Sequence, residues 1–260
     1  MQELMTGKTV LVTGGTQGLG LAIAEAAARE GAEAVAVVGR NAEKAEAAAA
    51  RITAAGATGF PIVADLAKPG EAERVVAKTI TRFGRIDSLV NAAGATSRGT
   101  LLDTSRELLD EHLAINLVAP FMTMQGAVAD MRGRGEPGTI LNIITMSMHG
   151  GQPYLAPYVA SKAGLAGLTK NAAFAHRFDR IRINGLNIGW TATPGEAVTQ
   201  RTFHGAGDDW LEAASAAQPM GKLGQPDEIA DAVVFLLSER SGVVTGSIID
   251  WDQLIPGAYE

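Results

Sequence analysis

Short apolar runs alternate with longer segments in which apolar residues recur every three or four positions. The short runs are typical of strands buried on both faces, and the longer segments of amphipathic helices. The alternation predicts an α/β protein with one doubly wound parallel sheet and helices on both faces. Expected strands cover Thr9–Thr13, Ala34–Val38, Gly59–Val63, Ile86–Asn91, Thr139–Ile144, Arg182–Ile188 and Val244–Trp251, and expected helices cover Leu19–Glu30, Ala42–Ala55, Glu71–Phe83, Leu108–Arg132, Pro157–Phe178 and Pro226–Ser238.

Residues 190–218 break this rhythm with several glycines, an Asp208-Asp209 pair and two tryptophans. Long irregular insertions in compact domains often cover a binding site. No linker, repeat or low-complexity block divides the chain. We therefore expect one domain over residues 1–260, with residues 190–218 as an irregular lid above a substrate site.

A glycine-rich segment, Thr13–Gly20, connects the first expected strand to the first expected helix. Glycines allow a tight turn and close backbone approach, and the helix N-terminus presents free N–H groups to a pyrophosphate. The spacing Gly14-x-x-x-Gly18-x-Gly20 differs from the G-x-G-x-x-G form, and a tight turn without a ligand is the alternative. In this context the segment predicts a Rossmann-type dinucleotide site.

Composition narrows the choice of partners. The 260 residues carry a net charge of -6 and no cysteine. An acidic chain offers no basic field to nucleic acid or to an anionic membrane surface, and no apolar run is long enough to span a bilayer. The first residues do not form a signal peptide, so we expect a cytoplasmic protein. The histidines lack metal-ligand spacing, and we expect no metal site.

Tyr158 and Lys162 are four residues apart and therefore share one face of the expected helix Pro157–Phe178. A nearby cation favours the phenolate, so we expect Lys162 to lower the pKa of Tyr158. A tyrosine of this kind can pass a proton to or from an alcohol oxygen.

The glycine loop, Asn91-Ala92-Ala93-Gly94, Asn116 and Tyr158-x-x-x-Lys162 together resemble the short-chain dehydrogenase/reductase family over nearly the whole chain. The resemblance implies an oxidoreductase that transfers a hydride between a nicotinamide cofactor and a small alcohol or ketone. Enoyl reductases of the family typically place the tyrosine and lysine further apart, which favours carbonyl chemistry here. The family resemblance also implies a homotetramer. The alternative is a dinucleotide-binding sensor or structural subunit without turnover.

By this resemblance the catalytic set is Asn116, Thr145, Tyr158 and Lys162. Thr145 stands where the family commonly has serine, and Ser147 is the rival hydroxyl. Threonine keeps the donor but is stiffer and bulkier.

Arg40 follows the second expected strand, where an acid would select NAD(H) and an arginine can pair with a 2′-phosphate. NADP(H) is therefore the preferred cofactor, and NAD(H) stays possible because Gln17 occupies a loop position that is often basic. The resemblance implies the following cofactor-binding residues: Gly14, Thr16, Gln17, Gly18, Leu19, Gly20, Arg40, Asp65, Leu66, Asn91, Ala92, Ala93, Gly94, Tyr158, Lys162, Ile188, Gly189 and Thr193.

Candidate substrate residues lie after Thr145 and in the expected lid. They are polar or aromatic, which suits a small hydroxylated substrate such as a sugar or polyol better than a long acyl chain. They are Ser147, His149, Gln152, Tyr154, Trp190, His204 and Trp210.

Overall fold

The computed structural model describes residues 3–257, so residues 1–2 and 258–260 of the expected domain lie outside the described part. One seven-stranded sheet runs through it in the order β3-β2-β1-β4-β5-β6-β7. Every pairing is parallel, which confirms the predicted fold class. The strands are β1 (Thr9–Thr13), β2 (Ala34–Gly39), β3 (Thr58–Val63), β4 (Ser88–Asn91), β5 (Gly138–Thr145), β6 (Ile181–Ile188) and β7 (Ile248–Trp251).

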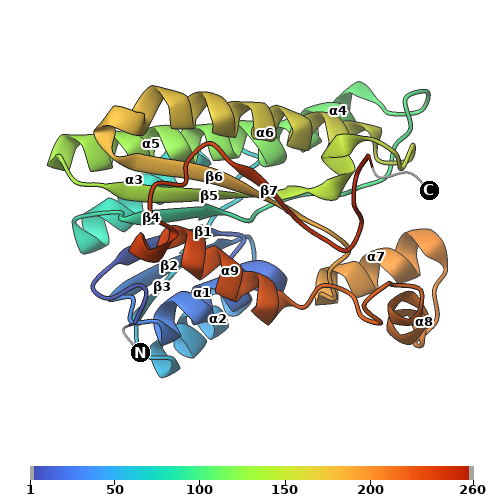
Figure 1. Ribbon diagram of the computed structural model, residues 1–260, viewed down its shortest axis with the longest axis horizontal. Coiled ribbons are helices and arrows are strands. Elements are labelled where there is room, and N and C mark those ends of the chain that lie inside the picture. Colours follow the sequence, from blue (N-terminus) through green and yellow to red (C-terminus); the bar gives the residue numbers. More distant parts are fainter. Residues whose placement is uncertain (1–2, 258–260) are drawn as a thin grey trace.

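Helices cover both faces of the sheet (Figure 1). One face carries α1 (Gly18–Arg29), α2 (Ala42–Ala54) and α9 (Pro226–Leu237), and the other carries α3 (Glu71–Phe83), α5 (Ala119–Arg134) and α6 (Ala156–His176). The remaining helices are α4 (Arg106–Leu113), α7 (Pro194–His204) and α8 (Trp210–Ala216), with short turns η1 (Ala114–Val118), η2 (Met146–His149), η3 (Arg177–Asp179) and η4 (Glu239–Ser241).

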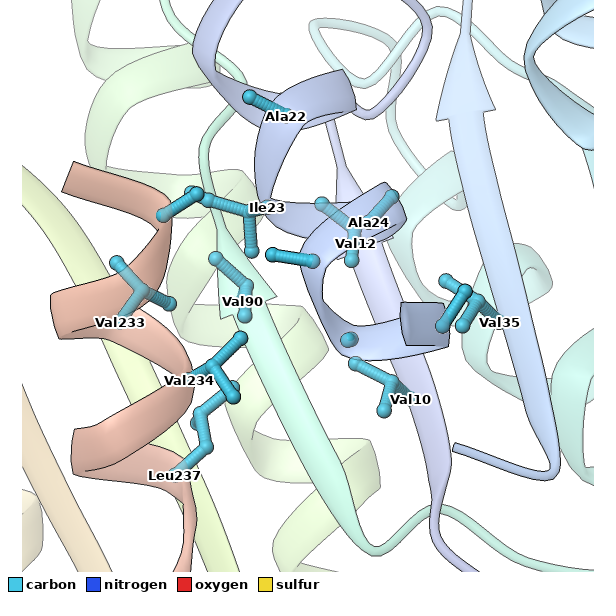
Figure 2. Close-up of a cluster of buried hydrophobic side chains, with 14 of the residues drawn as sticks. Val10, Val12, Ala22, Ile23, Ala24, Val35, Val90, Val233, Val234 and Leu237 are labelled. Carbon is cyan, nitrogen blue, oxygen red and sulfur yellow. The ribbon is translucent and has the colours of Figure 1, made fainter. Parts of the chain in front are cut away.

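Apolar side chains fill the space between the sheet and α1 and α9 (Figure 2). Val12 and Val90, from neighbouring strands, are fully buried beneath Ile23 of α1 and Val233 of α9. Each such side chain stabilises the fold by about 1.5–3 kcal/mol relative to an exposed position. This packing fixes α1, and with it the glycine loop at its N-terminus, against the centre of the sheet.

The expected helix Leu108–Arg132 is interrupted in the structure. A π-helical turn, η1, separates α4 from α5. Pro120, at the start of α5, has no N–H to donate and so cannot support a regular α-helical ladder at this point. The prediction of one continuous helix is therefore wrong, and Asn116 lies within the wide turn.

The prediction of an irregular stretch over residues 190–218 is also wrong, because α7 and α8 form there. The Thr193 hydroxyl accepts a hydrogen bond of 3.0 Å from the Glu196 N–H, with Pro194 in the first turn. Gly205 ends α7 with φ +62°, a left-handed conformation that suits glycine. At the other end of the chain, Gly246 (φ +73°) breaks extended backbone, so the last strand begins at Ile248 rather than Val244.

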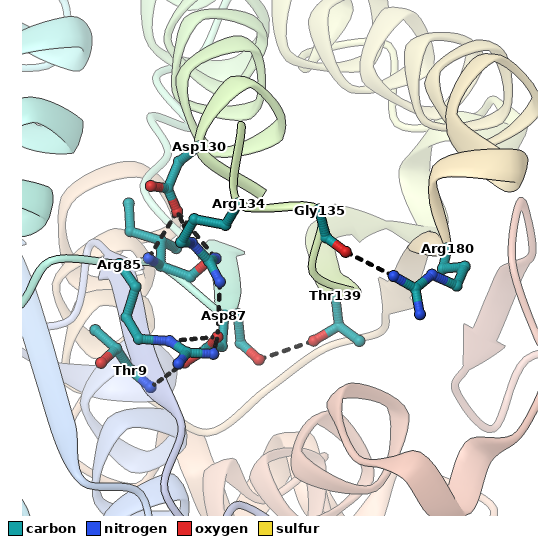
Figure 3. Close-up of polar contacts among 10 residues, drawn as sticks. Thr9, Arg85, Asp87, Asp130, Arg134, Gly135, Thr139 and Arg180 are labelled. Carbon is teal, nitrogen blue, oxygen red and sulfur yellow. Dashed lines mark hydrogen bonds and ion pairs between the residues drawn. The ribbon is translucent and has the colours of Figure 1, made fainter. Parts of the chain in front are cut away.

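Asp87 joins the N-terminal ends of the central strands, on the edge opposite the glycine loop (Figure 3). Its side chain is 2 % exposed and accepts hydrogen bonds from the Thr9 N–H at 2.8 Å and from Arg85 Nε at 2.9 Å. Arg134 lies 3.7 Å from the same carboxylate and donates to the Ile86 carbonyl. The buried carboxylate thus ties β1, the start of β4 and the end of α5 together.

Asp87→Ala is expected to lower the free energy of unfolding by about 2–4 kcal/mol, because the Thr9 N–H loses its buried partner and Arg85 loses the carboxylate that it pairs with. Asp110→Ala, which removes the exposed pair with Arg106, is the control and should cost less than about 1 kcal/mol. Urea unfolding measures both. Equal losses in the two variants would contradict the role given to Asp87.

Candidate active site

A cavity of about 450 Å³ lies at the carboxyl edge of the sheet, between the glycine loop and the N-terminal half of α6. Parallel sheets bind ligands at this edge, where the strand order reverses, and here the reversal falls between β1 and β4. The expected cofactor residues that line the cavity are Gly14, Thr16, Gln17, Gly18, Leu19, Gly20, Arg40, Leu66, Ala92, Ala93, Gly94, Tyr158, Lys162, Ile188 and Thr193.

The glycines of the loop are required by close packing. Gly14 has φ +67°, and a Cβ there would lie 2.7 Å from the Ala93 nitrogen. Gly18 has φ +54°, and a Cβ there would meet only the Thr193 side chain, at 3.6 Å. The loop therefore presses against the residues that follow β4 and leaves its outer surface and the N-terminus of α1 open, which fits a pyrophosphate group.

Three expected cofactor residues lie outside this cavity lining. The Asp65 carboxylate accepts a hydrogen bond of 3.3 Å from the Ala67 N–H within its own turn. Asn91 is 1 % exposed and bonds Asn142 and Thr123, so it joins β4 to β5 and α5. Gly189 lines a second cavity of about 260 Å³ beside the C-terminal segment.

Two basic side chains border the end of the cavity near β2. Arg40 is exposed and lines it, as expected. Lys44, in the first turn of α2, also lines it and donates a hydrogen bond of 2.7 Å to Gln17 Oε1. Sequence reasoning looked for a second basic residue only inside the glycine loop and missed Lys44. The signal was its position three residues after the helix cap Asn41, which turns it toward the loop.

Lys162 is 4 % exposed, and its Nζ donates a hydrogen bond of 2.7 Å to the Ile143 carbonyl near the end of β5. Burial lowers the pKa of Lys162 to about 8. The ammonium group therefore remains largely charged at neutral pH, although it is withdrawn from solvent.

Tyr158 lies one helical turn before Lys162, and burial raises the pKa of Tyr158 to about 12. A hydrogen bond with Thr145 and the charge of Arg98 oppose this rise, and the charge of Glu196 adds to it. Lys162 is not among these causes, so the expected lowering by Lys162 is not found. The physical reason is desolvation, which penalises the phenolate more than its neighbours stabilise it.

Thr145 ends β5 and is 7 % exposed. Of the two rival hydroxyls, Thr145 is the one bonded to Tyr158, whereas Ser147 donates a hydrogen bond of 2.5 Å to Gln152 Oε1. Thr145 Oγ1 also lies 3.3 Å from Ser147 Oγ, so the three side chains form one hydrogen-bonded row.

Asn116 is fully buried in the π-helical turn. Its side chain bonds both the N–H and the carbonyl of Ala95, at 2.9 and 3.0 Å, and donates to Ser161 at 3.0 Å. Asn116 thus locks the loop after β4 to α6, the helix that carries Tyr158 and Lys162. Wide turns of this type frequently occur at functional sites.

The other substrate candidates lie in two groups. In the first group, His149 Nε2 lies 3.1 Å from Asp250 Oδ1. Burial favours a higher pKa of Asp250, but hydrogen bonds from Asn187 and His149 outweigh burial and lower the pKa. The second group is aromatic. The Tyr154 and His204 rings, 5.8 Å apart, join the loop before α6 to the expected lid, and the Trp190 and Trp210 rings, 6.5 Å apart, pack within the lid.

Within residues 3–257, no helix has the length and apolar character needed to cross a membrane, and no cluster of three or more acidic or histidine side chains is arranged to hold a metal ion.

Comparisons with known proteins identify the family. The family model described as "Enoyl-(Acyl carrier protein) reductase" matches residues 4–253. An uncharacterized oxidoreductase of Thermotoga maritima is 35% identical over 246 residues, which are 95% of this chain and 96% of that protein. L-Rhamnose 1-dehydrogenase (NAD(P)(+)) of a Sphingomonas species is 31% identical over 248 residues, which are 95% of each chain.

A solved structure of L-sorbose reductase from Gluconobacter frateurii, complexed with NADPH and L-sorbose, superimposes with a TM-score of 0.92 at 30% identity and covers 100% of both chains. With these matches over nearly its full length, the chain belongs to the short-chain dehydrogenase/reductase family.

Lys162→Met is expected to raise the free energy of unfolding at pH 7 by about 1–3 kcal/mol, since it removes a desolvated charge. The pKa of Lys162 is lowered on folding, so the folded state binds fewer protons and the destabilisation is fully present below about pH 8. It disappears as the pH rises toward the pKa of the unfolded chain.

Urea unfolding at pH 7 and at higher pH measures this difference between the variant and the wild type. The gap should narrow with rising pH, and a gap that widens or stays constant would contradict the burial argument.

Proposed function

We propose that this protein is an NAD(P)-dependent oxidoreductase that transfers a hydride between a nicotinamide cofactor and a small alcohol or ketone. The observation that supports this best is that Tyr158 and Lys162 line the same cavity as the glycine loop. A proton-transferring side chain therefore faces the space in which a dinucleotide fits. A sensor or structural subunit would have no use for a desolvated ammonium and phenol at this place.

Each residue then has a definite task. A nicotinamide dinucleotide supplies the hydride donor or acceptor when bound. Tyr158, protonated at neutral pH, gives its proton to the carbonyl oxygen in reduction, and Thr145 donates a hydrogen bond to the same oxygen. Lys162 supplies a fixed positive charge, held in place by the Ile143 carbonyl. Asn116 holds the loop after β4 against α6 through hydrogen bonds to Ala95 and Ser161.

NADP(H) is the proposed cofactor, with NAD(H) as a weaker substitute. Arg40 and Lys44 lie at the same end of the cavity, where a 2′-phosphate needs cationic partners. The L-sorbose reductase was solved with NADPH, and the L-rhamnose dehydrogenase is named for NAD(P)(+).

We propose a sugar or polyol as the substrate class. The names of both relatives point to sugars, and Thr145, Ser147 and Gln152 form a polar row beside Tyr158. The matching family model is described by enoyl reduction, but the Tyr158–Lys162 spacing favours carbonyl chemistry, as the sequence already indicated.

A homotetramer stays a proposal. Val118, Phe121 and Phe174 on η1, α5 and α6 expose 52%, 45% and 68% of their surfaces, which suits helix packing against another copy. The cytoplasmic location likewise remains a prediction from the sequence.

Tyr158→Phe is expected to lower kcat for ketone reduction by about 10²–10⁴-fold, because no acid then protonates the carbonyl oxygen. Absorbance of the reduced cofactor measures turnover, and fluorescence titration of NADPH should show unchanged binding. Unaltered turnover in this variant would exclude the proposed acid.

Arg40→Asp is expected to lower the ratio of kcat/KM with NADPH to kcat/KM with NADH by about 10–100-fold, since a charge-assisted bond to phosphate is replaced by repulsion. Arg29→Asp, exposed at the far end of α1, is the matched control. The same ratio in both variants would argue against Arg40 as the phosphate partner.

A further inference from the structure

Glu196 lies in the first turn of α7, and its charge acts on Tyr158. Its backbone N–H is capped by Thr193, which lines the cavity together with Tyr158. Glu196 Oε1 accepts hydrogen bonds from Trp190 Nε1 at 2.8 Å and from Gln200 Nε2 at 2.6 Å. Within the described residues, no group hydrogen-bonds Oε2. The carboxylate is therefore held in one orientation with a free acceptor.

Arg98 lies in the loop after β4, close to the start of α6. The adjacent Gly99 pairs with the entry to α6, because its N–H donates to the Tyr154 carbonyl at 2.9 Å and its carbonyl accepts from the Ala156 N–H at 3.0 Å. This pairing places Arg98 next to the turn that carries Tyr158. The charges of both Arg98 and Glu196 act on the Tyr158 phenol.

The Arg98 guanidinium is also held in a fixed position. It lies over the rings of Tyr154 and Phe203, at 5.3 and 5.2 Å from their centres, and donates to the Thr96 carbonyl at 2.9 Å. Its Nη2 lies 3.0 Å from His204 Nε2. Among the described residues no carboxylate pairs with Arg98, and its buried Nε has no hydrogen-bond partner. Since a guanidinium has five N–H groups, donors remain for a ligand.

We propose that Glu196 and Arg98 are specificity-determining residues that bind two different hydroxyl groups of a neutral, polyhydroxylated substrate whose carbonyl lies at Tyr158. Glu196 accepts a hydrogen bond from one hydroxyl, and Arg98 donates one to the oxygen of another. The negative charge of Glu196 disfavours anionic substrates, and the positive charge of Arg98 disfavours cationic ones. This inference rests on the proposed function and names the residues that select the substrate.

Two ketones of equal carbon number, one with hydroxyl groups and one without, distinguish substrate recognition from the chemical step, because only the first can bind Glu196 and Arg98 through hydroxyls. A ketohexose and 2-hexanone are reduced with NADPH by the wild type, Glu196→Gln and Arg98→Met. Each variant should lower kcat/KM for the ketohexose by about 10–100-fold, as expected for loss of a hydrogen bond to a charged group. The value for 2-hexanone should change by less than about threefold. Glu212→Gln and Arg201→Met, exposed in the same pair of lid helices, are the matched controls.

The pH dependence of 2-hexanol oxidation gives a second readout, one that damage to the lid alone would not produce. The inflection of the pH–rate profile that follows the pKa of Tyr158 should move to lower pH when the Glu196 charge is removed. It should move to higher pH when the Arg98 charge is removed. Shifts in opposite directions support the proposal.

Equal loss for both ketones, or shifts in the same direction, would overturn it. A wild type that reduces 2-hexanone but no ketohexose overturns this inference alone. A wild type that binds NADPH but reduces neither ketone overturns the proposed function as well.

Discussion

The withdrawal of Lys162 from water is the constraint on which the site depends. A buried ammonium must be hydrogen-bonded, and its partner is the carbonyl of Ile143 in β5. The bond forms only when β5 and α6 pack in one register, so Tyr158, one turn earlier on α6, is positioned by the same packing. The core that holds the helices against the sheet is therefore also what places the proton donor beside the cavity.

The sheet order explains why the cavity lies where it does. The chain leaves β1 and β4 in opposite directions across the sheet, which opens a crevice between their carboxyl ends. Gly14 follows β1 and presses on Ala93 after β4, so the floor of the crevice is closed by backbone. On the opposite edge, Asp87 joins the beginnings of the same two strands. The two strands are thus fixed at both ends, and the loops between them carry the binding groups.

Local pattern predicted the repeated strands and helices well, because their buried faces have clear periods. It failed where a single hydrogen bond, or the lack of one, decides whether a helix begins or is interrupted. Pro120 splits a helix whose apolar pattern is continuous, and Thr193 with Glu196 starts a helix in a stretch whose glycines indicated a loop. Catalytic candidates came from motif spacing. Lys44 carried only a local signal, its place after the helix cap Asn41. Arg98 and Glu196 carried none, since each reaches the site through long-range packing that one sequence does not display.

The electrostatics of Tyr158 link recognition to chemistry. Burial raises the pKa of Tyr158 further above neutrality, so the phenol stays protonated, which suits reduction but opposes the reverse reaction. Arg98 and Glu196 act on it with opposite signs, and Glu196 belongs to α7, which packs over the cleft through Phe203 and His204. Any movement of α7 therefore changes the proton affinity of Tyr158 as well as the shape of the site. A substrate hydroxyl that donates a hydrogen bond to Glu196 weakens the effect of the Glu196 charge on the pKa of Tyr158. A substrate with a hydroxyl at this position therefore also changes the acidity of its own proton donor.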